Sequence, residues 1–353
     1  MFLNTELFGH QRGASNKGYK KIKYGTMVLS TQNLHLGNAN VNLRFDHGMV
    51  SPAYKTYVIT GCSVDLIAQW IKSDAAKRFF YNATTVGASV CRRNVEWDTL
   101  YEQSLYLPCR DEQEKVAKFL GLLSNRINKQ QRFVSALKKY KRGVFEAIFT
   151  RKLRLVPKAR QSDWTAFELS DFATRITRKN NGATDIPLTI SAQYGLIDQR
   201  DFFSKVVASS DMSGYYLLRR GEYAYNRSTS NDYPFGSIKR LELYNEGAVS
   251  TLYLCFAIKE DVVLSNFAKW YFESSQWHRG VNEICAEGAR NHGLLNVPTD
   301  DFFDTVHILP SDIEEQAQIA AFLSRVHDKL AKAQEELDKL IGLRNGLMQQ
   351  LFI

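Results

Sequence analysis

The chain contains two copies of one sequence pattern, and this repeat limits its possible folds more than any other feature. Matching residues stay 203 positions apart from Glu112 and Glu315 onward, as far as Phe149 and Phe352. The run includes Glu112-Gln113 with Glu315-Gln316 and Phe119-Leu120 with Phe322-Leu323, and the pair Leu107-Pro108 with Leu309-Pro310 precedes it at a spacing of 202. A repeat of this length predicts two structural units of the same kind.

Further matches precede this run at spacings between 196 and 203 positions. They pair Gly48-Met49-Val50-Ser51 and Tyr54 with Gly247-Ala248-Val249-Ser250 and Tyr253, and Ile22-Lys23-Tyr24-Gly25 with Leu218-Arg219-Arg220-Gly221. The second copy begins at Trp164, 57 residues before Gly221, whereas only 24 residues precede Gly25. By this alignment the first copy lacks its opening 30 or so residues. We favour a truncated or rearranged first copy, and a naturally shorter domain is the alternative.

Each copy is expected to hold a mixed α/β domain followed by one long helix. Four runs have strand character: 27–29, 57–59, 251–256 and 306–309. Helical spacing of aromatic and aliphatic residues predicts helices at 63–72 and 264–273, with most of these side chains in the core. The resulting segments are 1–107 (first domain), 108–150 (central long helix), 151–163 (basic linker), 164–309 (second domain) and 310–353 (C-terminal long helix).

Both long helices carry a heptad pattern with alternating steps of four and three residues, typical of a coiled-coil seam. The apolar seam positions are Leu123, Ile127, Val134, Leu137, Val144 and Ile148 in the first helix, and Val326, Leu330, Leu337, Leu340, Leu347 and Leu351 in the second. Lys141 and Arg344 occupy the same step of each seam. Each cation either fixes the register of the pair or lies at a fraying helix end, where its amine or guanidinium reaches solvent.

Net charge differs between the two helices. Residues 121–160 contain twelve Lys and Arg against one Glu, a net +11, whereas residues 310–353 have a net charge of −2. Opposite charges favour pairing of the two helices with each other. The whole chain carries +9. The dense basic run indicates a phosphate backbone or an acidic partner, and a solvated helix face is the alternative.

Polar and basic loops are the candidate DNA-binding sites. Arg, Asn and Gln side chains read base edges, whereas Lys, Ser and Thr hold phosphates, although such residues also build ordinary turns. In the first copy the candidates are Lys20, Lys21, Lys23, Arg92 and Arg93. In the second copy they are Arg175, Arg178, Lys179, Asn180, Asn181, Asn226, Arg227, Ser228, Tyr233, Arg290, Asn291 and His292.

Several enzyme classes lack their motifs here. No two prolines are adjacent, no proline precedes an aspartate, and no glycine precedes a lysine. These facts exclude the Asn-Pro-Pro-aromatic motif of amino-methyltransferases, the Pro-Asp of many nucleases and the P-loop. We therefore expect no catalytic residue. The spacing of His and Cys predicts no metal site, and the five scattered cysteines suit a reducing cytosol. No apolar run is long enough to span a membrane.

The duplicated unit, with Leu-Pro, Glu-Gln and Phe-Leu opening each long helix, resembles the specificity subunit of type I restriction–modification systems over nearly the whole chain. The resemblance implies a mixed α/β fold with two target-recognition domains, each reading one half of a bipartite DNA sequence. It also implies that the two long helices pair as an antiparallel coiled coil. The short first domain departs from the family pattern, which puts in doubt whether it still reads DNA.

The same resemblance implies partners and a role in phage defence. The chain would have no chemistry of its own, and it would assemble with double-stranded DNA, two methyltransferase subunits and restriction subunits. S-adenosylmethionine would be bound by the methyltransferase, and ATP and Mg by the restriction subunit, with no cofactor on this chain. The alternatives are a duplicated coiled-coil protein-binding adaptor and a truncated specificity subunit with altered or lost target recognition.

Overall fold

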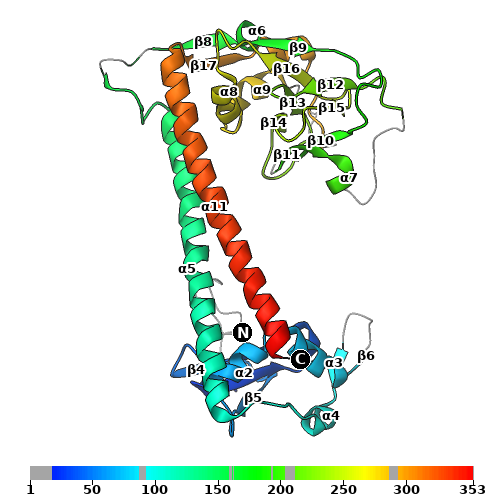
Figure 1. The fold of residues 1–353 in the computed structure, drawn as a ribbon, viewed down its shortest axis with the longest axis vertical. Coiled ribbons are helices and arrows are strands. Elements are labelled where there is room, and N and C mark those ends of the chain that lie inside the picture. The colour runs from blue at the N-terminus through cyan, green and yellow to red at the C-terminus, as the bar shows by residue number, and fades with distance from the viewer. Residues whose placement is uncertain are drawn as a thin grey trace. The chain divides into compact units, whose positions relative to one another are not determined.

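The computed structural model describes residues 18–86, 93–158, 161, 163–191, 194–202, 211–285 and 293–352. The chain separates into two compact units. Unit 1 combines the chain up to Ala136 with the segment from Ala331 onward, and unit 2 runs from Leu137 to Leu330. Each unit thus contains one of the repeated domains and a part of each long helix, α5 (Arg110–Phe149) and α11 (Ile313–Leu351) (Figure 1).

The domain of unit 1 is built on a three-stranded antiparallel sheet in the order β3-β2-β5, beside the pair β1-β4 and the pair β6-β7. Its elements are β1 (Lys20–Lys23), β2 (Thr26–Ser30), η1 (Leu34–Leu36), β3 (Ala39–Val41), β4 (His47–Val50), β5 (Tyr54–Val58), α2 (Val64–Trp70), α3 (Asp74–Asn82), β6 (Thr84–Val86), β7 (Arg93–Val95) and α4 (Trp97–Glu102). The helices α2 and α3 begin at Ser63 and Ser73, whose hydroxyls accept a hydrogen bond from a first-turn backbone N–H.

The domain of unit 2 has a four-stranded sheet in the order β14-β13-β16-β9, with the pairs β12-β15, β10-β11 and β17-β8 around it. Its elements are β8 (Trp164–Glu168), α6 (Leu169–Phe172), β9 (Ala173–Ile176), β10 (Leu188–Ser191), β11 (Gly195–Asp198), α7 (Gln199–Phe202), β12 (Tyr216–Arg219), β13 (Tyr223–Asn226), β14 (Ser237–Arg240), β15 (Glu246–Val249), β16 (Leu254–Ile258), α8 (Ser265–Phe272), α9 (His278–Ile284), α10 (Thr299–Phe303) and β17 (Val306–Pro310).

The strand pairings of the two domains share one register, which confirms the duplication. Met27 pairs with Tyr57 and Val41 in unit 1, and Tyr223 pairs with Phe256 and Arg240 in unit 2. The β1-β4 and β12-β15 pairs also agree, with Lys20 opposite Val50 and Tyr216 opposite Val249. The first strand of each set is shifted by 196 positions and its partner by 199. Strands β8 to β11 have no counterpart among the described residues of unit 1.

One buried glutamine joins the start of each long helix to its domain. Gln113 Oε1 accepts a hydrogen bond from the Ser63 N–H (2.8 Å), and its Nε2 donates to the Pro108 carbonyl (2.9 Å). Gln316 accepts from the Leu264 N–H and donates to the Pro310 carbonyl at the same two distances. Ser63 and Leu264 directly precede α2 and α8. The repeated Glu-Gln sequence is therefore a structural contact that recurs in both units.

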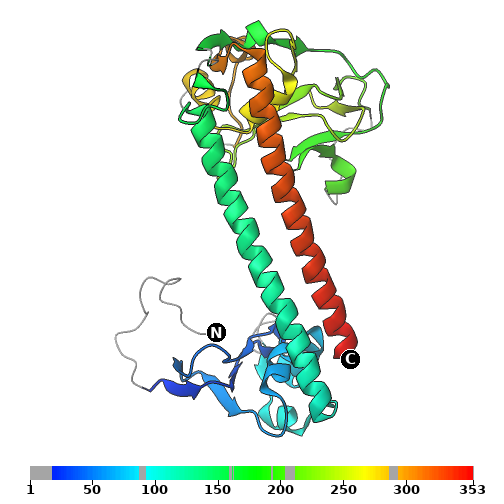
Figure 2. The same cartoon turned by 60° about the vertical axis from the view of Figure 1, so that its left-hand side comes forward.

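Both units show that α5 and α11 pack antiparallel, as predicted (Figure 2). In unit 1, Leu120 near the start of α5 shares a core with Met348 and Phe352 at the end of the chain's second long helix. In unit 2, Ile148 near the end of α5 shares a core with Leu323 near the start of α11. The helix ends complete the domain cores, so each compact unit includes a part of both long helices.

Burial follows the heptad pattern with one exception. Val134, Val144, Ile148, Val326 and Leu337 are buried, and Leu123, Ile127, Leu137, Leu330, Leu340 and Leu347 are half-buried. The seam position predicted for Leu351 is wrong, because its side chain is 42% exposed and Met348 is buried in its place. Leu351 lies in the last turn of α11, where the side chain that faces the domain core, and not the heptad step, determines burial.

Charge contributes less to this pairing than the sequence indicated. Arg126 and Glu336 form an ion pair across α5 and α11 (2.6 Å) with both side chains about half exposed, and such a pair contributes less than about 1 kcal/mol. The apolar seam and the buried contact of Gln130 Nε2 with the Ala333 carbonyl (2.8 Å) are the stronger terms.

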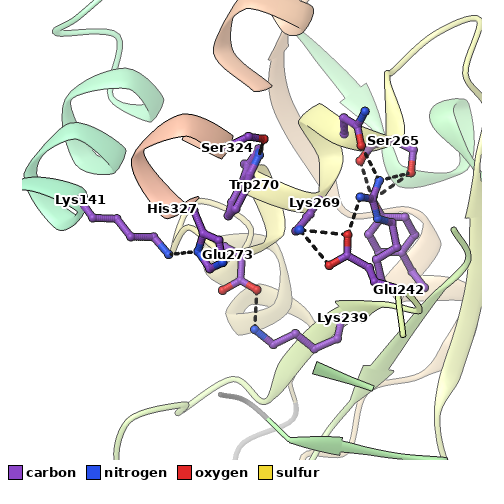
Figure 3. Close-up of polar contacts among 12 residues, drawn as sticks. Lys141, Lys239, Glu242, Ser265, Lys269, Trp270, Glu273, Ser324 and His327 are labelled. Atoms are coloured by element: carbon purple, nitrogen blue, oxygen red, sulfur yellow. Dashed lines mark hydrogen bonds and ion pairs between the residues drawn. The ribbon is translucent and has the colours of Figure 1, made fainter. Parts of the chain in front are cut away.

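The seam cation Lys141 lies inside unit 2. Its Nζ is 3.2 Å from His327 Nδ1 (Figure 3). The same atom lies over the rings of Phe145 and Trp270. Burial is the main cause that lowers the pKa of Lys141. The fraying-end alternative is wrong for this residue, because α5 continues to Phe149.

We predict that Gln316→Leu destabilises unit 2 by about 1–3 kcal/mol, because it leaves the Leu264 N–H and the Pro310 carbonyl buried without their partner. Thermal unfolding and hydrogen exchange of α8 measure the effect. Gln349→Leu, at an exposed position of α11, is the control and should change neither. Equal stability of the two variants would contradict the structural role of Gln316.

A buried histidine makes the stability of unit 2 depend on pH. The Thr305 hydroxyl donates to the Phe302 carbonyl (2.7 Å), so His307 Nε2–H donates to Thr305 Oγ1 (3.0 Å) and Nδ1 accepts from the Tyr271 hydroxyl (2.9 Å). Burial lowers the pKa of His307 to about 4, from 6.5. The unfolded chain therefore takes up this proton first as the pH falls.

We predict that the stability contributed by neutral His307 is complete above pH 6.5 and is lost as the pH falls to about 4. The total loss is about 3 kcal/mol, from about 1.4 kcal/mol per pKa unit. Urea unfolding at a series of pH values measures it. His307→Gln should flatten this dependence, and His47→Gln, on the exposed side of β4, should leave it unchanged. An unaltered slope in His307→Gln would refute this assignment.

Candidate nucleic-acid interface

Within each unit, a segment that holds candidate residues contacts a second loop from a distant part of the chain. In unit 2, the loop after β13 contacts the segment that follows residue 292: the Thr229 N–H donates to the Gly293 carbonyl (2.7 Å), and Ser228 forms a β-bridge with Leu294. In unit 1, Gln32 bridges Asn94, and the Asn33 Oδ1 accepts from the Arg93 N–H (3.0 Å). The sequence placed these loops far apart along the chain, and their repeated contact supports a common surface.

Arg227 holds this loop arrangement in place. Its guanidinium donates to the carbonyls of Val297 (3.1 Å) and Leu252 (3.0 Å), which lie on two other segments of unit 2. A guanidinium bound to backbone carbonyls fixes loop geometry and has fewer N–H groups left for a base. The structure therefore places Arg227 as a positioning residue of the loop.

Three candidate side chains of the 175–181 stretch are also held by contacts within unit 2. Arg178 forms an ion pair with Glu222 (2.7 Å) and donates to the Leu217 carbonyl. Asn180 is buried, and its side chain bonds both the N–H and the carbonyl of Thr184 (3.0 Å each), which closes a turn. Lys179 Nζ donates to the Gly214 carbonyl (2.9 Å). Asn181 follows in the left-handed region with φ 45°, as expected in a tight turn.

Two candidates of unit 1 are also held internally. Arg93 Nε and Nη2 donate to the hydroxyl and the carbonyl of Thr84 (2.8 and 2.7 Å), and its guanidinium lies over the Tyr81 ring. Lys20 Nζ donates to the Tyr54 carbonyl (2.7 Å). These contacts join strands of one domain, so both side chains stabilise the domain in the positions that the structure gives them.

The remaining described candidates face solvent to a larger degree. Arg175 on β9 and Lys21 and Lys23 on β1 are exposed, and no polar side-chain contact of these three is seen among the described residues. Ser228 is exposed, Asn226 is half-buried and accepts from the Ser228 N–H (3.0 Å), and Tyr233 is half-buried. Burial is the main cause that raises the pKa of Tyr233. Arg92, Arg290, Asn291 and His292 lie outside the described residues.

The alignment of the two domains identifies one further candidate DNA-binding cation that the sequence analysis did not include. Arg219 lies at the end of β12, 196 positions after Lys23 at the end of β1, and both side chains are exposed. The sequence match of Lys23-Tyr24-Gly25 with Arg219-Arg220-Gly221 already held this signal. Equivalent exposed cations in both domains suit a ligand that contacts both with a repeated anionic backbone.

Other cations of unit 2 are neutralised within the domain. Lys239 pairs with Glu273 (2.5 Å) and Lys269 with Glu242 (2.8 Å), joining β14 and its following turn to α8 (Figure 3). Burial acts to raise the pKa of Glu242, but the bonds from Lys269 and Arg240 outweigh it and lower the pKa. These lysines therefore brace the domain and add little net positive charge to its surface.

No family model and no curated protein sequence matches the chain. Several solved structures are similar to it. The S subunit of the type I restriction-modification system from M. genitalium has a TM-score of 0.58 and 12% identity, over 97% of this chain and 87% of that one. A chain from a study of complex assembly and conformational transition of the type I R-M system has a TM-score of 0.52 and 15% identity, over 96% and 84%.

This likeness defines the class of fold. The chain has the fold of type I restriction–modification S subunits, with two repeated mixed α/β domains and two long antiparallel helices. The resemblance predicted from the duplicated Leu-Pro, Glu-Gln and Phe-Leu motifs is thus confirmed at the level of the fold.

We predict that Arg227→Ala lowers the stability of unit 2 by about 1–2 kcal/mol, because two backbone carbonyls lose their donors. Arg175→Ala, at an exposed strand position, should change stability by less than about 0.5 kcal/mol. Thermal unfolding of both variants measures the difference. If Arg175→Ala is the more destabilising change, the division into positioning and exposed residues is wrong.

Proposed function

We propose that this chain is the non-catalytic DNA sequence-recognition subunit of a type I restriction–modification complex, and that it directs the methyltransferase and restriction subunits to a bipartite target. The observation that carries the proposal is the duplication: each unit joins one domain of the same strand register to the ends of both long helices. The shared fold with type I S subunits supports the same conclusion.

Surface charge supports a nucleic-acid ligand. The chain carries +9, and residues 121–160 alone carry +11. Lys138, Lys139 and Arg142 of this region are exposed on α5. Exposed cations at equivalent positions of the two domains, Lys23 and Arg219, add to this charge. A phosphate backbone is the ligand that this distribution favours.

The partners follow from the proposed role. Two methyltransferase subunits would carry S-adenosylmethionine, and restriction subunits would carry ATP and Mg, in the cytoplasm. This chain would contribute recognition alone. No cluster of metal-ligating side chains is found in the described part of the chain. None of the helices within the described ranges has the length and hydropathy needed to cross a membrane.

Binding of the assembled complex to DNA at increasing salt tests the proposal. Log affinity should fall linearly with log salt, and the quadruple variant Lys21→Ala, Lys23→Ala, Arg175→Ala, Arg219→Ala should reduce the slope by about 0.9 per lost phosphate contact. Lys332→Ala, at an exposed position of α11, is the control. Selection from a randomised DNA library then reads out the half-sites.

Three results would overturn the proposal. A complex that selects no split sequence from the library does not recognise a bipartite target. A chain whose binding to partners is insensitive to salt, and which does not bind DNA, behaves as a protein-binding adaptor. Methyl transfer or DNA cleavage by the purified chain alone would contradict the non-catalytic role.

A further inference from the structure

The repeat shows which strand edges of unit 1 lack a partner strand among the described residues. Strand β5 is the counterpart of β16, because both pair in the same register with β2 and β13. In unit 2, the outer edge of β16 is covered by β9, with Phe256 opposite Arg175. In the described part of unit 1, β5 pairs with β2 alone. Val58 on this free edge is 82% exposed.

A second edge lies beside the first. Segment 104–108 is the counterpart of β17, at a spacing of 202 positions, and in unit 2 the partner of β17 is β8, with Ile308 opposite Ala166. Tyr106, the counterpart of Ile308, is 94% exposed, and no strand pairs with this segment among the described residues. Strands β8 and β9 are joined by the single turn α6, so one continuous segment covers both edges in unit 2.

Between these two edges, unit 1 has an apolar cavity of about 330 Å³. Met27, Tyr57, Trp70, Phe79, Leu100 and Leu105 are among its lining residues. In unit 2 the counterpart space is filled. Leu169 and Phe172 of α6 are fully buried there, within the core that includes Phe256 and Tyr271, the counterparts of Tyr57 and Trp70.

Two contacts place Phe172 at the position that corresponds to this cavity. Its ring packs edge-on against His307 (5.5 Å between centroids), and its carbonyl accepts from the Lys259 N–H (2.8 Å). The counterparts of His307 and Lys259 are Leu105 and Thr60, and both line the cavity of unit 1. The cavity therefore has the position of a side chain that the second domain supplies from its own chain.

We propose that this surface of unit 1 binds a strand–turn–strand segment of another polypeptide, built like Trp164–Ile176. Its two strands add to β5 and to segment 104–108, and two apolar side chains at the positions of Leu169 and Phe172 enter the cavity. A free strand edge beside an apolar cavity is a surface that folded proteins cover. The proposal does not rest on the proposed function.

Two observations favour this occupant over residues 1–17 of the same chain and over a second copy of the chain. In the sequence alignment, the 196-position spacing of Lys20 and Tyr216 matches residues 1–17 with 197–213 and not with 164–176. A second copy of this chain has its own Trp164–Ile176 segment buried in unit 2, with Leu169 and Phe172 both at 0% exposure. A segment from a different chain is free of both constraints.

A labelled peptide with the sequence of residues 163–177 tests the proposal by fluorescence anisotropy against the full chain. We expect saturable binding, and we expect Val58→Lys, on the rim of the cavity, to weaken it at least tenfold. Val86→Lys is the matched control, because Val86 is also an exposed strand valine (63%) but does not line the cavity. A peptide with aspartate in place of Leu169 and Phe172 should not bind.

Each other outcome overturns the proposal. No binding, or equal binding to the Val58→Lys and Val86→Lys variants, removes the cavity as the site. If the peptide binds only after deletion of residues 1–17, the chain covers this surface itself. If light scattering shows a dimer that Val58→Lys dissociates, a second copy of the chain is the occupant.

Discussion

The hydrogen bonds of Gln113 and Gln316 are the contacts on which the rest of the structure depends. Each amide joins the first turn of a long helix to the start of a domain helix, and both amides are buried. A buried amide that satisfies two backbone groups has one favourable geometry, whereas an apolar side chain in the same place would tolerate sliding. This contact therefore fixes the direction in which each long helix leaves its domain.

Away from this contact, apolar packing contributes more than charge to the pairing of the two long helices. The described seam is apolar except at positions such as Gln130 and Lys141, and both of these are used in specific contacts. The excess of basic residues on α5 is mostly exposed. It is thus available for a ligand of opposite charge, whereas a seam built on ion pairs would have consumed it.

The sequence predicted the fold, but it did not predict which candidate side chains are held by contacts within the domains, for physical reasons. A repeat and a heptad pattern are each specified by many residues, so one error such as Leu351 does not change the architecture. The role of a single side chain depends on one or two contacts that periodicity does not encode. Arg227 and Asn180 look like base readers in the sequence, but their polar atoms hold backbone groups that only the folded chain brings near. Arg219 could have been predicted as a candidate from the sequence, because the repeat already aligned it with Lys23.

The division of the helices between the units has a consequence for biosynthesis. The core of unit 1 includes Met348 and Phe352, so the domain made first during translation lacks part of its core until these two residues have left the ribosome. Unit 2 is contiguous from Leu137 to Leu330 and has all its residues earlier. Domains generally fold as units. We therefore expect the second domain to complete its core before the first, and we expect a nascent chain stalled near Leu330 to expose an unfinished N-terminal core.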